Sequence, residues 1–123
     1  MKICFSATGN NLSSAVDWRF GRCPWFVIVD EKGEIVEAIK NPAGDAFRGA
    51  GVLAAQTVVE KGAEAVVSGN IGPNAFLVLN QQGIKVYQGG GMTVKEAWEK
   101  YQKGELPEIT TPQRGRCFGE QGK

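Results

Sequence analysis

The chain of 123 residues contains no histidine, only three cysteines and no long apolar run. The absence of histidine excludes the usual general base at neutral pH, the serine–histidine and cysteine–histidine nucleophile pairs, and the zinc ligand sets that use imidazole. No apolar stretch approaches the roughly 20 residues that cross a bilayer. The first residues turn polar too soon for a signal peptide. We therefore expect neither a membrane protein nor a secreted one.

Net charge is also scarce, because 14 Lys and Arg residues stand against 13 Asp and Glu residues and leave +1. This balance argues against a large electrostatic footprint for nucleic acid or anionic lipid. Cys4, Cys23 and Cys117 have no Cys-x-x-Cys spacing. An odd number of cysteines without a signal peptide favours a reducing cytoplasm over a disulfide framework. The expectation is a cytoplasmic protein without nucleic-acid or membrane partners.

Hydrophobic periodicity predicts five strands and three helices. The strands are expected at Lys2–Ala7, Trp25–Asp30, Ile35–Lys40, Ala65–Ser68 and Ile84–Tyr87, and the helices at Gly51–Lys61, Pro73–Gln82 and Thr93–Tyr101. A short hairpin loop makes the second and third strands antiparallel, whereas helix-linked strands pair in parallel. The sequence thus predicts an α/β domain with a mixed five-stranded sheet, in the order strand-strand-strand-helix-strand-helix-strand-helix. The domain is expected at residues 1–103, followed by a flexible tail at 104–123.

The three strands that are expected to pair in parallel are each followed by a glycine-rich loop. The second and third of these loops contain Gly69, Asn70 and Gly72, and Gly89, Gly90 and Gly91. Ligands of open parallel sheets bind beyond the carboxyl ends of the strands, where loops that lead into helices offer backbone N–H groups to an anion. An N–H cradle is therefore one interpretation of these loops. The alternative is that each glycine only serves a tight turn.

The connection between the first two expected strands combines a thiol with positive charge. Arg22 precedes Cys23 and Arg19 lies close by, so adjacent cations are expected to favour the thiolate form of Cys23. A thiolate with guanidinium neighbours suits an anionic cluster of the iron–sulfur type. The alternative is that Cys23 fills a small apolar space while Asp17 pairs with Arg19. Cys4, inside a strand expected to be buried, is interpreted as part of the core.

Competing motifs are weak. Residues 49–54 fit the dinucleotide pattern G-x-G-x-x-A, but no strand leads directly into them and the next strand ends in Ser68 rather than an acidic residue. The chain has no Walker A pattern, and no carboxylates are grouped at the expected strand ends. An enzyme is therefore the least expected class.

Several strings of the chain resemble the dinitrogenase iron–molybdenum cofactor biosynthesis family, of the NifX/NifB C-terminal type. They are Val16–Asp30, Asn41–Pro42, Gly49–Gly51, Ser68–Phe76 and Gly83–Tyr87, in the family's order, within about residues 1–103. The resemblance implies a three-layer α/β/α domain with a ribonuclease-H-like motif. It also implies non-enzymatic binding or carriage of an iron–sulfur or iron–molybdenum–sulfur cluster, which a donor or acceptor protein would deliver or receive.

The candidate site consists of the residues that match the family's motifs, together with one further charge partner and the glycine loops. It comprises Asp17, Arg19, Phe20, Gly21, Arg22, Cys23, Gly69, Asn70, Gly72, Gly89, Gly90 and Gly91. Because histidine is absent, Cys23, either alone or together with Cys117, is the candidate metal ligand. A second hypothesis is a regulatory module that binds a phosphorylated small molecule or a nucleotide at the same edge of the sheet.

Overall fold

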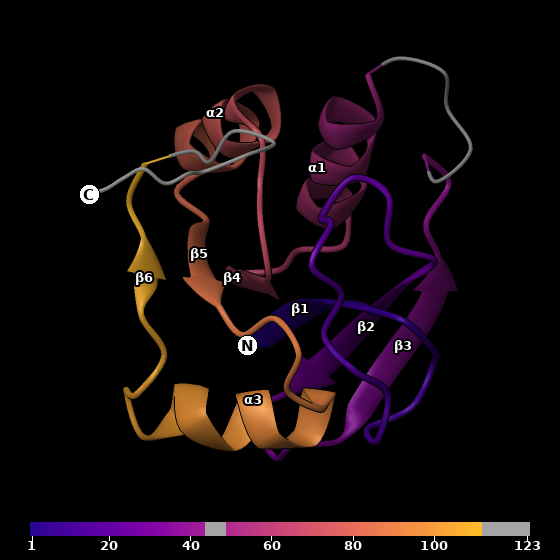
Figure 1. The fold of residues 1–123 in the computed structure, drawn as a ribbon, viewed down its shortest axis with the longest axis vertical. Helices are drawn as coiled ribbons and strands as arrows, with labels where there is room; N and C mark the ends of the chain where they lie inside the picture. The colour runs from indigo at the N-terminus through magenta and orange to yellow at the C-terminus, as the bar shows by residue number, and fades with distance from the viewer. Residues whose placement is uncertain (44–48, 112–123) are drawn as a thin grey trace.

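The computed structural model describes residues 1–43 and 49–111. Its strands are β1 (Lys2–Ala7), β2 (Trp25–Asp30), β3 (Ile35–Lys40), β4 (Ala65–Ser68), β5 (Lys85–Gln88) and β6 (Glu108–Ile109), and its helices are α1 (Ala50–Glu60), α2 (Pro73–Gln81) and α3 (Val94–Gln102). The predicted α/β class is confirmed. Helices α1 and α2 lie on one side of the sheet and α3 on the other (Figure 1).

The sheet is mixed, with the strand order β3-β2-β1-β4-β5-β6. Strand β4 pairs in parallel with β1 and β5, whereas β2 is antiparallel to both of its neighbours. The carboxylate of Asp30 accepts hydrogen bonds from the backbone N–H groups of Lys32 (2.9 Å) and Glu34 (3.0 Å), which fixes the β2–β3 turn. The predicted hairpin and the predicted parallel pairs of helix-linked strands are therefore both present.

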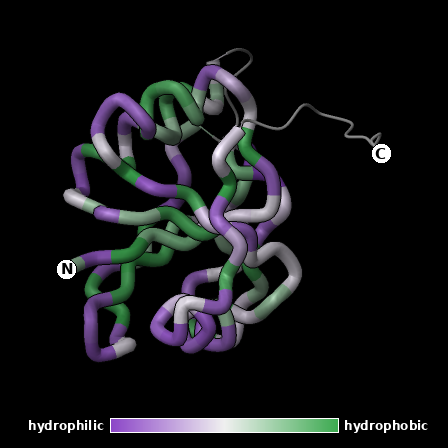
Figure 2. Tube along the Cα trace, turned by 90° about the vertical axis from the view of Figure 1, so that its left-hand side faces the viewer, coloured by the Kyte–Doolittle hydropathy of each residue, from purple (hydrophilic) through white to green (hydrophobic). Residues whose placement is uncertain are grey.

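The two faces of the sheet bury separate hydrophobic clusters. Cys4, Ile28 and Val66 face α1 and α2, which contribute Val58 and Leu79. The alternate residues of the same strands face α3, among them Phe5, Val27 and Val67. Because β1 and β4 are covered on both faces, Ile3–Phe5 of β1 and Ala65–Val67 of β4 are unbroken apolar runs. Figure 2 shows the hydrophobic residues gathered along the strands.

The sheet has six strands in the described residues, one more than expected. The extra strand β6 lies in the stretch predicted to be a flexible tail, and Leu106 and Ile109 are buried there, one against each cluster. The N–H group of Gln88 donates to the carbonyl of Pro107 at 2.8 Å. A strand of two residues beside a proline has no periodicity for a sequence pattern to detect. Residues 112–123, including Cys117, lie outside the described residues.

Helix ends follow the local sequence. The hydroxyl of Thr93 accepts a hydrogen bond from the N–H group of Glu96 at 3.0 Å and so caps α3, which was expected to begin at Thr93. Glycines with positive φ, Gly62 and Gly83, follow α1 and α2. In residues 1–43 and 49–111, no helix combines the length and the apolarity that a bilayer crossing needs.

Candidate functional site

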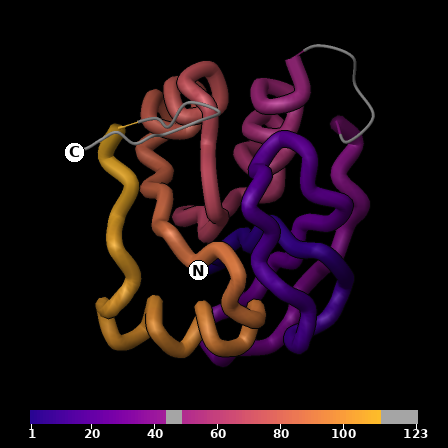
Figure 3. The backbone as a smooth tube through the Cα atoms, viewed as in Figure 1, coloured from indigo at the N-terminus to yellow at the C-terminus, as the bar shows by residue number. Residues whose placement is uncertain are grey.

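The connection between β1 and β2 passes over the carboxyl end of the sheet, from the start of α3 to the start of α1 (Figure 3). It is hydrogen-bonded to the loop after β4. Gly69 N–H donates to the carbonyl of Asp17 (3.0 Å), Asn70 N–H to that of Trp18 (2.7 Å), and Phe20 N–H to that of Asn70 (3.2 Å). The structure thus brings the Asp17–Phe20 segment and the Gly69–Asn70 loop together, as the candidate site requires.

The N–H groups of the glycine loops are already used inside the protein. Besides those of Gly69 and Asn70, three more donate to internal oxygens: Gly89 to the carbonyl of Ser68 (3.0 Å), Gly90 to Oε1 of Gln88 (2.8 Å) and Gly91 to the carbonyl of Val16 (3.0 Å). A donor that is bound internally is not available to a ligand. The expectation that these five groups form an N–H cradle is therefore wrong.

The glycines instead make room for Trp18, which sequence reasoning left out of the candidate site. A Cβ at Gly69 would collide with the Cα of Trp18, and a Cβ at Gly90 would lie 2.7 Å from its indole ring. Even so, Trp18 is 53% exposed. The signal in the sequence was a large aromatic residue next to Arg19 in a loop that faces glycine-rich loops.

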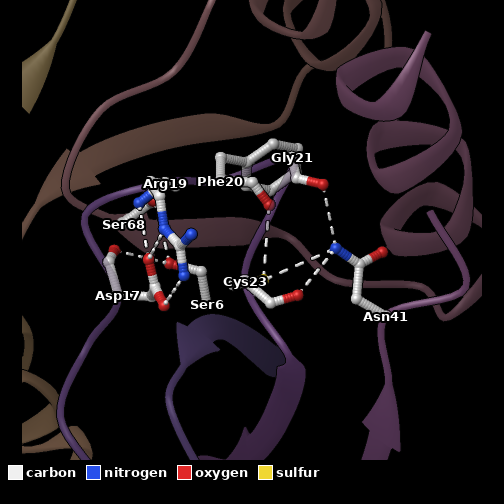
Figure 4. Close-up of polar contacts among 8 residues, drawn as sticks. All are labelled: Ser6, Asp17, Arg19, Phe20, Gly21, Cys23, Asn41 and Ser68. Atoms are coloured by element: carbon white, nitrogen blue, oxygen red, sulfur yellow. Dashed lines mark hydrogen bonds and ion pairs between the residues drawn. The ribbon is translucent and has the colours of Figure 1, made fainter. Parts of the chain in front are cut away.

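Asp17 and Arg19 form a fixed ion pair. Asp17 is only 5% exposed. Its Oδ1 accepts from the backbone N–H (2.8 Å) and the Nε (3.1 Å) of Arg19, and its Oδ2 from Nη2 (3.2 Å). The hydroxyl of Ser6 donates to the carbonyl of Asp17 at 3.1 Å (Figure 4). The hydrogen bond to the carboxylate raises the pKa of the guanidinium. The Arg19 side chain remains 63% exposed, so Asp17 displays a permanent cation in one position.

Cys23 is fully buried, contrary to what a metal ligand at the surface would need. Its thiol donates to the carbonyl of Phe20 at 3.3 Å. The side-chain amide of Asn41 donates to the carbonyls of Gly21 (3.1 Å) and Cys23 (2.9 Å) and holds the turn from the other side (Figure 4). Sequence reasoning gave Asn41 no role in the site, although its Asn-Pro pair follows directly after a strand.

Burial, with the negative charge of Asp17 second, raises the pKa of the Cys23 thiol to about 12. The expectation that neighbouring arginines stabilise a Cys23 thiolate is therefore wrong. The physical reason is that burial removes the water that would solvate the anion, while the Arg19 guanidinium is engaged by Asp17. This conformation agrees with the alternative interpretation, in which Cys23 fills a small apolar space while Asp17 pairs with Arg19.

Two helix N-termini flank the Arg19–Cys23 turn. The backbone of Gly21 contacts the start of α1 so closely that a Cβ there would lie 2.9 Å from the amide nitrogen of Gly51. A Cβ on Gly51 would in turn lie 3.3 Å from Ala75 of α2. The cap residues Gly49 and Gly72 provide no side-chain hydrogen bond, and neither first turn contains an acidic residue. The positive ends of two helices thus meet beside the Gly21 backbone of this turn.

The N-terminus of α3, by contrast, is capped and its first N–H groups are hydrogen-bonded inside the protein. The N–H groups of Val94 and Lys95 donate to the carbonyls of Ser14 (2.8 Å) and Leu12 (3.0 Å), and Thr93 caps the helix. Helices α1 and α2 therefore differ from α3 in having a glycine as the N-cap residue, which supplies no side-chain cap.

A family model described as "Dinitrogenase iron-molybdenum cofactor" matches residues 1–104. The chain belongs to this family. The resemblance seen in its motifs is thereby confirmed, and the match includes the whole of the Arg19–Cys23 turn.

Three proteins are similar to this family member in sequence, and two of them also have similar solved structures. An uncharacterized protein of Methanocaldococcus jannaschii is 37% identical over 109 residues, 86% of this chain and 89% of that protein. The apo form of the orange protein from Desulfovibrio gigas has a TM-score of 0.86 and 37% identity, covering 92% of this chain and 96% of that one. A NifB candidate from Thermotoga has a TM-score of 0.78 and 37% identity, covering 94% and 98%.

Side-chain metal ligands are not grouped in residues 1–43 and 49–111 of this family member. Within the described part of the chain, no three Cys, Asp or Glu residues are placed to hold a metal ion together. Cys4 lies in the same buried cluster as Cys23, and burial raises the pKa of its thiol as well. In this conformation the arrangement is suited to holding an anion by charge rather than by a set of coordinating side chains.

Proposed function

We propose that this member of the dinitrogenase iron-molybdenum cofactor family binds and carries an anionic iron–sulfur or iron–molybdenum–sulfur cluster as cargo, without catalysing a reaction. The observation that carries the proposal is the exposed Arg19 guanidinium, which a buried carboxylate holds. It lies two residues before Gly21, whose backbone packs against the start of α1. The family's description names such a cofactor. The structure of the orange protein is described as its apo form, which means the form without its bound ligand.

Each candidate residue has a role in this proposal. Arg19 and the exposed Arg22 attract the anion. Phe20 is buried and anchors the turn, and Gly21 lets the turn approach α1. The glycines and Asn70 of the loops after β4 and β5 support the floor of the site by their internal hydrogen bonds: Gly69, Asn70, Gly89, Gly90 and Gly91. Gly72 leads into the open N-terminus of α2.

Ligation by Cys23 is a separate and more demanding part of the proposal. The thiol would have to break its hydrogen bond to Phe20, become exposed and lose its proton before a metal–sulfur bond could form. Cys23 would therefore ligate only after the turn opens. Charge and helix ends would hold the cluster before that.

We further infer that the domain comprises residues 1–103 with a ribonuclease-H-like motif, supplemented by β6, and that it acts in the cytoplasm with donor or acceptor proteins of the cluster. The strand order β3-β2-β1-β4-β5, with β1, β4 and β5 parallel, supports the motif. The absence of Cys-x-x-Cys spacing and the odd number of cysteines support a reducing compartment.

The test is anaerobic reconstitution with iron, sulfide and molybdate, followed by visible absorption and metal analysis. The wild-type chain is expected to take up metal, and Arg19→Gln to bind about tenfold more weakly, because one charge-assisted contact is lost. Lys32→Gln, at the β2–β3 turn, is the matched control and should bind like wild type. Colourless, metal-free wild-type protein would refute the proposal.

Paired helix N-termini also suit a phosphate group, which favours the second candidate, a phosphorylated small molecule or nucleotide. Thermal unfolding with nucleotides and with reconstitution mixture separates the two candidates. Stabilisation by nucleotides alone would select the regulatory module.

A further inference from the structure

Trp18 is held rigidly although half of its side chain faces water. Its carbonyl accepts the N–H group of Asn70 at 2.7 Å, and its Cα lies against Gly69. Its ring lies over Gly90 and Gly91, where added Cβ atoms would be 2.7 and 3.5 Å from it. The indole is 53% exposed. A flat, immobile apolar surface is thus open to solvent at the carboxyl end of β4 and β5, where the candidate site lies.

The residues around Trp18 limit the kinds of ligand that can bind against its indole ring. Arg19, the next residue, supplies a fixed positive charge, which favours an anion. The backbone N–H groups of the glycine loops that contact Trp18, those of Gly69, Asn70, Gly90 and Gly91, are already hydrogen-bonded inside the protein. An oxyanion beside the indole would therefore exchange its water shell for the donors of the Arg19 guanidinium and the indole N–H alone among these neighbours. Sulfide ligands are larger, more polarizable and less hydrated, and sulfur makes favourable contacts with aromatic rings.

We propose that Trp18 is the specificity-determining residue of this site and selects sulfide-bearing anions over oxyanions. The proposal rests on the proposed function, because it concerns the same site. Arg19 attracts both kinds of anion, and contact with the indole ring favours the one whose surface is sulfur. The indole packs on the backbone at Gly69, Gly90 and Gly91, and side chains at Gly69 and Gly90 would collide with it.

Tetrathiomolybdate and molybdate are matched probes, since both are tetrahedral dianions of one metal and differ in sulfur against oxygen. Equilibrium dialysis with molybdenum analysis measures the dissociation constant of each probe. The wild-type chain is expected to prefer tetrathiomolybdate, and Trp18→Gln to reduce that preference by about tenfold while binding molybdate as before. Trp18→Phe keeps an aromatic face and should retain most of the preference. Val36→Gln, at a similarly exposed apolar residue on β3, is the control.

The outcomes separate the two proposals. Wild-type protein that binds neither probe overturns the proposed function and this inference with it. Wild-type protein that prefers tetrathiomolybdate, with Trp18→Gln equally selective, leaves the function standing and overturns the role of Trp18. Equal loss of both probes in Trp18→Gln also overturns it, because the side chain would then only support the loop. Thermal unfolding of each variant confirms that it is folded.

Discussion

At the scale of single residues, the burial of Cys23 affects the pKa of its thiol more than the arginines next to it in the sequence do. Two arginines lie within four residues of this thiol, yet burial raises its pKa to about 12. An acidic group whose pKa is raised by folding contributes stability that is fully present below the unfolded value, and the contribution falls as the pH rises towards the folded value. The alkaline stability of the protein therefore reports on this residue.

Reduced wild-type protein is expected to lose stability between about pH 9 and pH 12, by about 1.4 kcal/mol per pH unit for each such thiol. The unfolded chain releases a proton there that folded Cys23 retains. Cys23→Ser removes the titrating group, so its unfolding free energy should fall less steeply. Urea denaturation at several pH values measures both slopes. Parallel curves for the two proteins would show that Cys23 does not titrate differently on folding.

The same substitution separates charge from ligation. Cys23→Ser is expected to bind tetrathiomolybdate within about twofold of wild type, because Arg19 and the helix ends are unchanged. Retention of iron after reconstitution should decrease, because the proposed metal–sulfur bond cannot form. Cys4→Ser, at the other buried thiol of the same cluster, is the control. Equal iron retention in all three proteins would exclude Cys23 as a ligand.

At the scale of elements, the β1–β2 connection is held by the close approach of backbones. Gly90→Ala is expected to destabilise the fold by about 1–3 kcal/mol, because its Cβ would press on the indole of Trp18 and on the Cα of Gly69. Gly72→Ala, where a Cβ would contact nothing within 4 Å, should be near neutral. Urea denaturation provides the comparison.

A double-mutant cycle identifies the contact responsible for that loss. In a Trp18→Ala background, Gly90→Ala should destabilise the fold less, because the indole is gone and only Gly69 remains in the way. Strictly additive effects would show that the indole does not rest on this glycine.

At the scale of the whole molecule, the segment that leads into β6 contributes to both clusters at one edge of the sheet, Leu106 to one and Ile109 of β6 to the other. Ile109→Ala is expected to lower the unfolding free energy by about 2 kcal/mol, because a buried side chain that packs against the α1–α2 side is truncated. Thr110→Ala, its exposed neighbour, is the control and should change stability little. Denaturation midpoints that are equal for both variants would mean that the strand adds nothing to the domain.

Repeating local patterns were sufficient to predict most of the architecture. The apolar runs of β1 and β4, the helical spacing of α1 and the glycines that stop helices are properties of short segments, and each element forms where its pattern lies. The Asp17–Phe20 segment and the glycine loops could also be predicted to meet, because the carboxyl ends of parallel strands share one edge. Strand β6 has no such pattern, since its two residues are a strand only beside β5.

What each polar group does at that edge depends on contacts between distant segments. Whether Cys23 is charged depends on Phe26, Asn41 and the helices that cover it. Whether the glycine N–H groups are available depends on the β1–β2 connection that occupies them. Desolvation and hydrogen-bond competition act between atoms brought together by folding, whereas sequence patterns describe neighbours along the chain. For that reason the chain alone indicated the place of the candidate site and its positive charge. Only the fold decided that the Cys23 thiol is buried and that the Trp18 side chain is exposed to solvent.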